Sequence, residues 1–257
     1  MPTLSIITVV YNAKTDLHKT LEELKQQQFT DFELIIIDGG STDGTLDIIK
    51  DYNDIVSYTV SEPDNGIYDA MNKGIKAAKG DWITFLNAGD FYVDQDRLAT
   101  IFSNDLTQKS FVYGDMFLLT ETEQKVRYLK AETLTKKSIA KGMIACHQAM
   151  FIRREKCPSY RNDLRYQGDL NWVMDILHGI DEAAIFYINK DIVYFKAGGF
   201  SDHTILQQLI EHLALILERY SFFTLIILIP RLLRRYLGKW LRKWLTISTF
   251  RFWLKSK

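Results

Sequence analysis

The sequence has few cysteines and prolines and no apolar run of the ~20 residues that a membrane-spanning helix needs. Its 257 residues include four prolines and only two cysteines, Cys146 and Cys157. Two cysteines are too few for a disulfide framework. Cys146 has no partner at the spacing of a zinc site, so a structural zinc is also excluded. The N-terminal segment lacks the basic region of a secretory signal. We therefore expect a protein of the reducing cytoplasm.

Acidic residues are missing from one end of the chain. The formal net charge is zero, yet all 32 acids lie at or before Glu218, and residues 220–257 contain nine of the 32 bases. Residues 1–219 therefore carry a net charge of −9 and the C-terminal segment carries +9. This asymmetry predicts two parts with different partners.

The glycine-rich phosphate loops G-x-G-x-x-G and G-x-x-x-x-G-K-[ST] are both absent, which excludes the usual phosphate cradles. A nucleotidyltransferase would carry a basic, glycine-rich loop after its first strand, and Tyr11–Ala13 is not such a loop. No segment resembles a nucleic-acid reader, so we expect no nucleic-acid partner.

Strand-like and helix-like segments alternate over the first 115 residues. This alternation predicts an α/β fold with a mostly parallel sheet and right-handed crossovers. The expected strands cover residues 4–10, 33–37, 56–61, 82–86 and 111–113, and the expected helices cover 16–27, 45–52 and 66–79. Beyond residue 120 the alternation weakens to an apolar segment at 149–152, a helical pattern at 169–177 and two strand-like segments within 185–195.

Each early strand is followed by polar residues. The run Trp82–Leu86, for example, ends in Asn87, Ala88, Gly89 and Asp90. Open α/β sheets bind ligands at the carboxyl ends of their strands, and small residues let a ligand approach the backbone. Carboxylates at this edge suit ribose hydroxyls and a hard cation such as Mg²⁺ or Mn²⁺. The pattern predicts a metal–nucleotide substrate.

Four segments resemble the ordered motifs of family 2 glycosyltransferases with the GT-A fold. They are LSIITVVYN at 4–12, IIDGGSTDGT at 36–45, NGIYDAMNKG at 65–74 and FLNAGD at 85–90. The resemblance implies a Rossmann-like domain at 1–202, with a nucleotide-sugar-binding half at 1–115 and an acceptor half at 116–202. Residues 203–257 would form a basic amphipathic helical tail.

The resemblance also implies inverting sugar transfer from a nucleotide-diphosphate sugar, with Asp90 as the ligand of a Mn²⁺ or Mg²⁺ ion. Asn87 departs from the family pattern, where many relatives have an aspartate, and this departure puts metal affinity in doubt. Tyr11 would stack on the base, and Asp43 would either contact the donor or only cap the next helix. The implied donor-binding residues are Thr8, Tyr11, Asn12, Asp38, Asp43, Asp64, Asn65, Asn72, Lys73, Asn87, Ala88 and Gly89.

The acceptor half offers a candidate general base. Asp169, in Arg165–Trp172, resembles the family segment that supplies the base, although an aspartate there could also be a simple helix N-cap. His147 would lie near the acceptor or be structural, and Asp115 would face the same cleft or cap a turn. His203 could add a metal ligand.

The tail mixes bases with large apolar residues over Arg231–Lys257. Such a composition suits an interfacial helix on anionic lipid, and the alternative is a helix packed on the catalytic domain or on a second subunit of a homo-oligomer. We expect an enzyme peripheral on the inner face of the cell membrane that extends a lipid-linked or oligosaccharide acceptor in surface-polysaccharide synthesis. The rival hypothesis is an inactive sugar-nucleotide-binding subunit.

Overall fold

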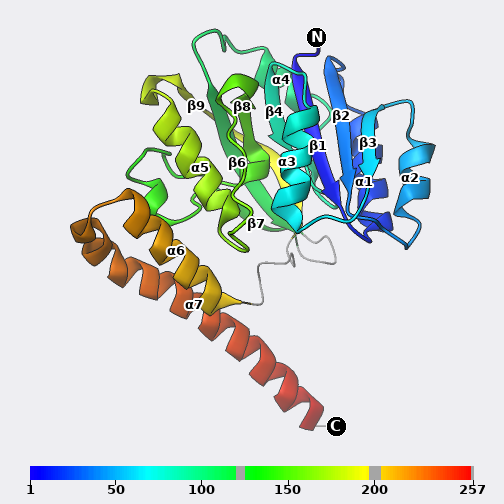
Figure 1. Cartoon of the computed structure of the whole chain (residues 1–257). Coiled ribbons are helices and arrows are strands. Elements are labelled where there is room, and N and C mark those ends of the chain that lie inside the picture. Colours follow the sequence, from blue (N-terminus) through cyan, green and yellow to red (C-terminus); the bar gives the residue numbers. More distant parts are fainter. Residues whose placement is uncertain (120–124, 197–203, 256–257) are drawn as a thin grey trace.

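The computed structural model describes residues 1–119, 125–196 and 204–255, with side chains in the last helix as far as residue 238. Figure 1 shows a central sheet flanked by helices, with two further helices beside it. The helices are α1 (Lys14–Lys25), α2 (Thr45–Asp51), α3 (Ile67–Ala77), α4 (Arg97–Phe102), α5 (Gly168–Gly179), α6 (Ile205–Arg219) and α7 (Phe222–Lys255). The strands are β1 (Leu4–Val10), β2 (Phe32–Asp38), β3 (Val56–Ser61), β4 (Trp82–Phe85), β5 (Phe91–Tyr92), β6 (Phe111–Leu119), β7 (Lys125–Leu129), β8 (Met150–Arg153) and β9 (Ile185–Lys196).

The sheet has the strand order β3-β2-β1-β4-β8-β6-β9-β5, and β7 pairs with β6. The pairs among β3, β2, β1 and β4 are parallel, as the alternating sequence predicts. Strand β8 joins antiparallel to both β4 and β6, whereas β9 runs parallel to β6. The carboxyl ends of β1, β2, β3 and β4 therefore lie at one edge, and the α/β prediction is confirmed.

Side chains of alternate residues place the core on both faces of the sheet. Ile7 and Val9 of β1 pack with α3 and α5, whereas Leu4 and Ile6 pack with α1 and α4 on the opposite face. Strand residues alternate in direction, so a strand buried on both faces needs apolar residues at nearly every position. All seven residues of β1 are buried, five of them are apolar, and the hydroxyls of Ser5 and Thr8 form hydrogen bonds with neighbouring segments of the chain.

Several elements from residue 91 onward differ from those expected from the sequence. Strands β5 and β7 and helix α4 were not predicted, and β6 continues to Leu119 because β7 and β9 both pair with its far end. The two strand-like segments expected within 185–195 form one strand, β9, whose left-handed residue Asn189 lies at a register shift.

The beginning of the tail packs on the segment around residues 140–143. Ile216, Leu228 and Leu232 form a cluster with Ala140, and the His212 ring nitrogens lie 3.0 Å from Ala140 O and 3.0 Å from Tyr236 Oη. Arg235 donates to the carbonyls of Lys141 and Met143. One face of α6 and α7 thus takes the packing alternative, and Figure 1 shows α7 continuing away from the sheet.

The opposite face of these two helices leaves many large apolar side chains exposed. Among the described residues, no helix is both long and apolar enough to cross a lipid bilayer. The exposed apolar residues are Leu206, Ile210, Leu217, Phe222, Phe223, Ile226, Ile227, Ile229, Leu233 and Leu237.

Candidate active site

The loops after β1 and β2 are tied together by side-chain hydrogen bonds. Asn12 has a left-handed backbone with φ 46°, a conformation that asparagine tolerates better than most residues. Its backbone N–H donates to Ser41 Oγ at 2.7 Å, and its Oδ1 accepts the Thr42 N–H at 2.8 Å. Asn12, which was predicted to bind the sugar donor, therefore connects the two loops through its backbone N–H and its side-chain oxygen.

Asp38, at the end of β2, is fully buried and presents one unpartnered oxygen. Its Oδ2 accepts hydrogen bonds from Gly40 N at 3.1 Å, Ser41 N at 3.0 Å and Ser61 Oγ at 2.5 Å. Among the described residues, Oδ1 has no hydrogen-bond partner. A buried acceptor without a donor costs free energy, so this oxygen is suited to a ligand hydroxyl or ring N–H.

Tyr11, Gly39 and Asp64 lie together beside Asp38. A Cβ added at Gly39 would stand 2.7 Å from Asp64 Oδ2 and 3.3 Å from the Tyr11 ring, so only glycine leaves this space open. Tyr11 is 64% exposed although it is aromatic, and Asp64 Oδ1 accepts the Gly66 N–H at 2.9 Å. The structure brings these three strand-end loops to one place.

Other predicted donor residues use their polar groups within the protein. Asp43 accepts from Lys14 N and from both Thr45 N and Oγ1, and these hydrogen bonds lower the pKa of its carboxyl group. The side chain of Asn72 bonds to the Tyr160 backbone and to Asn162. Lys73 forms ion pairs with Glu62 at 2.8 Å and Asp69 at 3.5 Å. The Asn65 N–H donates to Asp69.

Asp90 follows β4 and is buried. Its Oδ1 accepts the backbone N–H of Lys196, the last residue of β9, at 2.7 Å. Burial raises the pKa of Asp90 to about 7, against hydrogen bonds from Lys196 and Gln148 that lower it. The Lys196 ammonium lies 2.5 Å from Asp16 Oδ1, so β9 closes this part of the site. A cation beside this carboxyl group would favour its ionised form, which burial disfavours.

Asn87 and Asp90 supply oxygen atoms from a single turn. The Asp90 N–H donates to Asn87 O at 3.1 Å, and Asn87 Oδ1 is buried without a partner among the described residues. Thr8 donates to Leu86 O at 2.8 Å and fixes the strand end beside them, while Gly89 adopts φ 95°. Amide and carboxylate oxygens fit a hard divalent cation. Within the ranges that the structure describes, no group of three or more His, Cys, Asp and Glu residues could hold a metal.

Asp169 and His147 lie close together at the start of α5. Asp169 is the second residue of α5, and its Oδ2 lies 3.6 Å from His147 Nδ1. In the part of the chain that the structure describes, Asp169 Oδ1 and His147 Nε2 are both buried without hydrogen-bond partners. Burial, with smaller contributions from the charges of Asp90 and Asp169, raises the pKa of the nearby Cys146 thiol to about 12. The arrangement suits proton transfer rather than thiolate chemistry.

Asp115 lies in the middle of β6 rather than at a strand end. Its carboxylate accepts hydrogen bonds from Tyr128 Oη, from Ala131 N at 2.8 Å and from Tyr187 Oη at 2.7 Å. These three donors hold β7 and β9 against β6. His203 lies outside the described residues.

Comparison with known proteins identifies the family of the chain. Residues 5–158 match the family described as Glycosyl transferase family 2. The chain belongs to this family. It is 30% identical over 220 residues to a PGL/p-HBAD biosynthesis glycosyltransferase of Mycobacterium bovis BCG, a match that covers 82% of this chain and 84% of that relative.

Solved structures share the GT-A type of fold with this family 2 glycosyltransferase. S. aureus TarS 1–349 in complex with UDP matches with a TM-score of 0.66 and 18% identity over 91% of this chain and 71% of that one. A Pyrobaculum calidifontis mannosyltransferase in complex with GDP-Man and Mn²⁺ matches with a TM-score of 0.63 and 14% identity over 86% of this chain and 65% of that one.

Two residues of the transferase site were missed by the sequence reasoning. Gln148 is buried and bonds to the Asp90 carboxyl group, and Tyr68 of α3 accepts the Gly168 N–H at 3.1 Å, directly before Asp169. Tyr68 occupies an apolar position of a helical pattern, so nothing in the sequence separates it from a core residue. Gln148 follows His147 in the sequence, and this proximity to a predicted site residue was the one signal that could have identified it.

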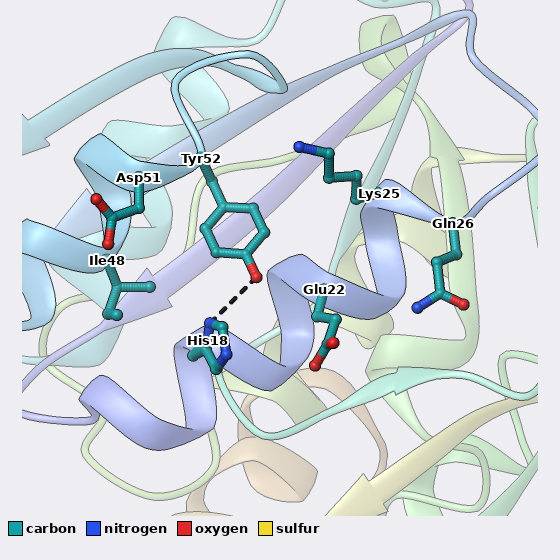
Figure 2. Close-up of a pocket in the computed structure, with 7 residues that line it drawn as sticks. All are labelled: His18, Glu22, Lys25, Gln26, Ile48, Asp51 and Tyr52. Carbon is teal, nitrogen blue, oxygen red and sulfur yellow. Dashed lines mark hydrogen bonds between the residues drawn. The ribbon is translucent and has the colours of Figure 1, made fainter.

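A surface hollow of about 440 Å³ between α1 and α2 is separate from these residues (Figure 2). His18, Glu22 and Lys25 of α1 face Asp51 and Tyr52 there, and Tyr52 Oη lies 3.1 Å from His18 Nδ1. None of the predicted site residues lines it, so we assign it no part in sugar transfer.

Proposed function

We propose that this family 2 glycosyltransferase inverts the anomeric centre as it moves a sugar from a nucleotide-diphosphate donor to a glycan acceptor, with Asp169 as the general base. The observation that carries the proposal is the position of Asp169 at the start of α5. Among the described residues its buried Oδ1 has no hydrogen-bond partner, and its Oδ2 lies 3.6 Å from His147 Nδ1. A general base needs such an available oxygen for the proton that it accepts.

The donor would bind along the carboxyl ends of β1, β2 and β4. Tyr11 would stack on the base, and Asp38 Oδ1 and Asp64 would accept hydrogen bonds from the base or ribose. Asp90 and Asn87 would hold a Mn²⁺ or Mg²⁺ ion, which supplies positive charge to the diphosphate leaving group. The solved relatives with UDP, and with GDP-Man and Mn²⁺, support a donor of this class.

In the proposed reaction, Asp169 takes the proton of the acceptor hydroxyl while the oxygen of that hydroxyl bonds to the sugar's anomeric carbon. The bond from that carbon to the diphosphate breaks on the opposite side, and the nucleoside diphosphate leaves with the electron pair. His147 would orient the Asp169 carboxylate.

The acceptor would be lipid-linked or an oligosaccharide of a surface polysaccharide, reached at the inner face of the membrane. The exposed apolar face of α6 and α7 and the nine bases of residues 220–257 support this location, since such surfaces bind anionic lipid.

The test begins with a panel of UDP- and GDP-sugars incubated with Mn²⁺ and analysed by mass spectrometry for hydrolysis or transfer. With the active donor, we expect Asp169→Asn to lower kcat by about 10²- to 10⁴-fold and to leave nucleotide affinity unchanged. The matched control is Asp181→Asn, because that carboxylate caps the turn Glu182–Ala184, beyond the opposite end of α5 from Asp169. Wild-type turnover in Asp169→Asn would remove the base assignment.

The second candidate is an inactive sugar-nucleotide-binding subunit, which the amide at Asn87 favours. It predicts nucleotide binding by calorimetry with no hydrolysis or transfer of any donor in the panel. Turnover that is lost in Asp90→Ala would exclude it.

A further inference from the structure

Glu211 of α6 accepts hydrogen bonds from three successive backbone N–H groups. Its Oε1 accepts from Arg165 N at 3.1 Å, and its Oε2 accepts from Tyr166 N at 2.9 Å and Gln167 N at 2.8 Å. Hydrogen bonds to an ionised carboxylate are about twice as strong as those between neutral groups. One side chain of the tail therefore fixes the loop that leads into α5.

The next backbone N–H along the chain is held from another side. Gly168 N donates to Tyr68 Oη, and a Cβ at this glycine would stand 2.4 Å from the Tyr68 ring. Gly168 is the first residue of α5, and N–H groups at the start of a helix have no partner within the helix. Together with the loop N–H groups of residues 165–167, four successive N–H groups are bound by side chains of α3 and α6, and Asp169 follows immediately.

The tail also contacts this loop through side chains. Gln167 Nε2 donates to Tyr236 Oη at 3.0 Å and to Gln208 O at 3.2 Å. Arg219 donates to Asn171 Oδ1 at 2.5 Å and to Asp175 Oδ1 at 2.6 Å on α5 itself. Helices α6 and α7 are thus attached to the base-bearing end of α5 at several points.

We propose that Glu211 is a positioning residue for the reaction: through residues 165–167 it holds Asp169 where it can reach the acceptor hydroxyl. The inference rests on the proposed base role of Asp169. It gives the tail a part in catalysis in addition to any contact with lipid. A displacement of ~1 Å in a catalytic group can cost about 10²-fold in rate, so loss of the three hydrogen bonds is expected to lower kcat without touching the donor site.

The test compares Glu211→Ala, Glu211→Gln and Glu218→Ala in the full chain, with kcat counted per UDP- or GDP-binding site by calorimetry. Glu218 is the matched control, since it lies on the same helix and forms its ion pair, among the described residues, with the partly exposed Arg161 rather than with the loop at 165–167. We expect Glu211→Ala to lower kcat about 10- to 100-fold with nucleotide affinity unchanged. Glu211→Gln keeps one acceptor oxygen and should lose less, and Glu218→Ala should retain wild-type kcat.

A double variant separates positioning from general stability. In the Asp169→Asn background, Glu211→Ala should lower kcat no further, because its effect passes through the missing base. A second loss that multiplies the first would overturn the inference, as would wild-type kcat in Glu211→Ala, or in Glu211→Gln where the alanine variant does not fold. If Asp169→Asn itself keeps full kcat, the base assignment is what has failed.

Discussion

Hydrogen-bond donors distinguish the buried carboxylates of this transferase. Both oxygens of Asp115 are engaged by donors from neighbouring strands, whereas all the donors of Asp38 meet at one oxygen and leave the other without a partner among the described residues. A structural carboxylate has its acceptors satisfied inside the fold. We therefore infer that Asp38 serves the ligand and Asp115 serves the sheet.

Asp90 is expected to reduce the stability of the metal-free protein at alkaline pH. Burial raises its pKa to about 7, above the ~4 of an aspartate in the unfolded chain. Its contribution to the free energy of unfolding is therefore complete below pH ~4 and is lost as the pH rises through about 7. We expect Asp90→Asn, without metal or nucleotide, to melt at a higher temperature than the wild type at pH 8, with a difference that shrinks toward pH 4.

The control for this measurement is Asp105→Asn. Hydrogen bonds from Thr107 lower the pKa of Asp105, so its contribution has the opposite dependence on pH and the variant should gain nothing at pH 8. Equal melting temperatures of wild type and Asp90→Asn across the whole range would contradict the expectation.

Helices α3 and α6 both contact the start of α5, and Gly168 is where the Tyr68 ring of α3 comes close to the α5 backbone. Tyr68 of α3 lies beneath it, and Tyr68 and Tyr160 stack with ring centroids 5.2 Å apart. Because the Tyr68 ring leaves no room for a Cβ at residue 168, the path of the chain before Asp169 depends on this one glycine.

Gly168→Ala is expected to destabilise the protein by about 1–3 kcal/mol through overpacking and to lower kcat per folded site by moving Asp169. The matched control is Gly74→Ala on α3, where an added Cβ would stand 2.4 Å from Ile7 Cγ2. That variant should lose comparable stability in thermal melts yet keep its kcat per nucleotide-binding site. Equal kcat in the two variants would show that α3 does not position the base.

The early elements could be predicted from sequence because each is fixed by a local pattern. Strand β3 was predicted with its observed bounds, and β1 likewise, whereas β5 has two residues and leaves no pattern to detect. The strand at Phe111 was expected to end before Asp115, yet β6 continues because strands distant in sequence pair with it. Glu211 and Tyr68 could not be identified, since their partners are backbone N–H groups that only the tertiary fold brings near.

On the scale of the whole molecule, α6 and α7 pack on the transferase domain with one face and expose apolar side chains on the other. One face carries His212, Arg235 and Tyr236 against the acceptor half, and the other exposes 76% of Phe223 and 77% of Ile227. The two alternatives for the tail therefore apply to different faces, with packing observed on one and lipid binding proposed for the other.

Substitution of Phe223 and Ile227 by aspartate is expected to weaken binding to phosphatidylserine vesicles at least tenfold in a flotation assay, with the melting temperature unchanged because both side chains are exposed. High salt should weaken wild-type binding as well, since it screens the basic residues. Tyr58→Asp, at an exposed position of the distant strand β3, is the control. Undiminished vesicle binding by the double variant would refute the lipid contact.

The hydrogen bonds of Glu211 also affect the order in which parts of the newly made chain can reach their final structure, because Glu211 is synthesised after the loop that it binds. The Asp90 carboxyl group is held by Gln148 and by Lys196 of β9, whereas the loop before Asp169 is fixed only after α6 and the Tyr236 region of α7 have emerged. We therefore expect the proposed base to reach its final position after the Asp90 carboxyl group during synthesis. The segment proposed to position the base also carries the exposed apolar face. We therefore expect transfer activity and the proposed lipid-binding surface to arise together, when α6 and α7 emerge.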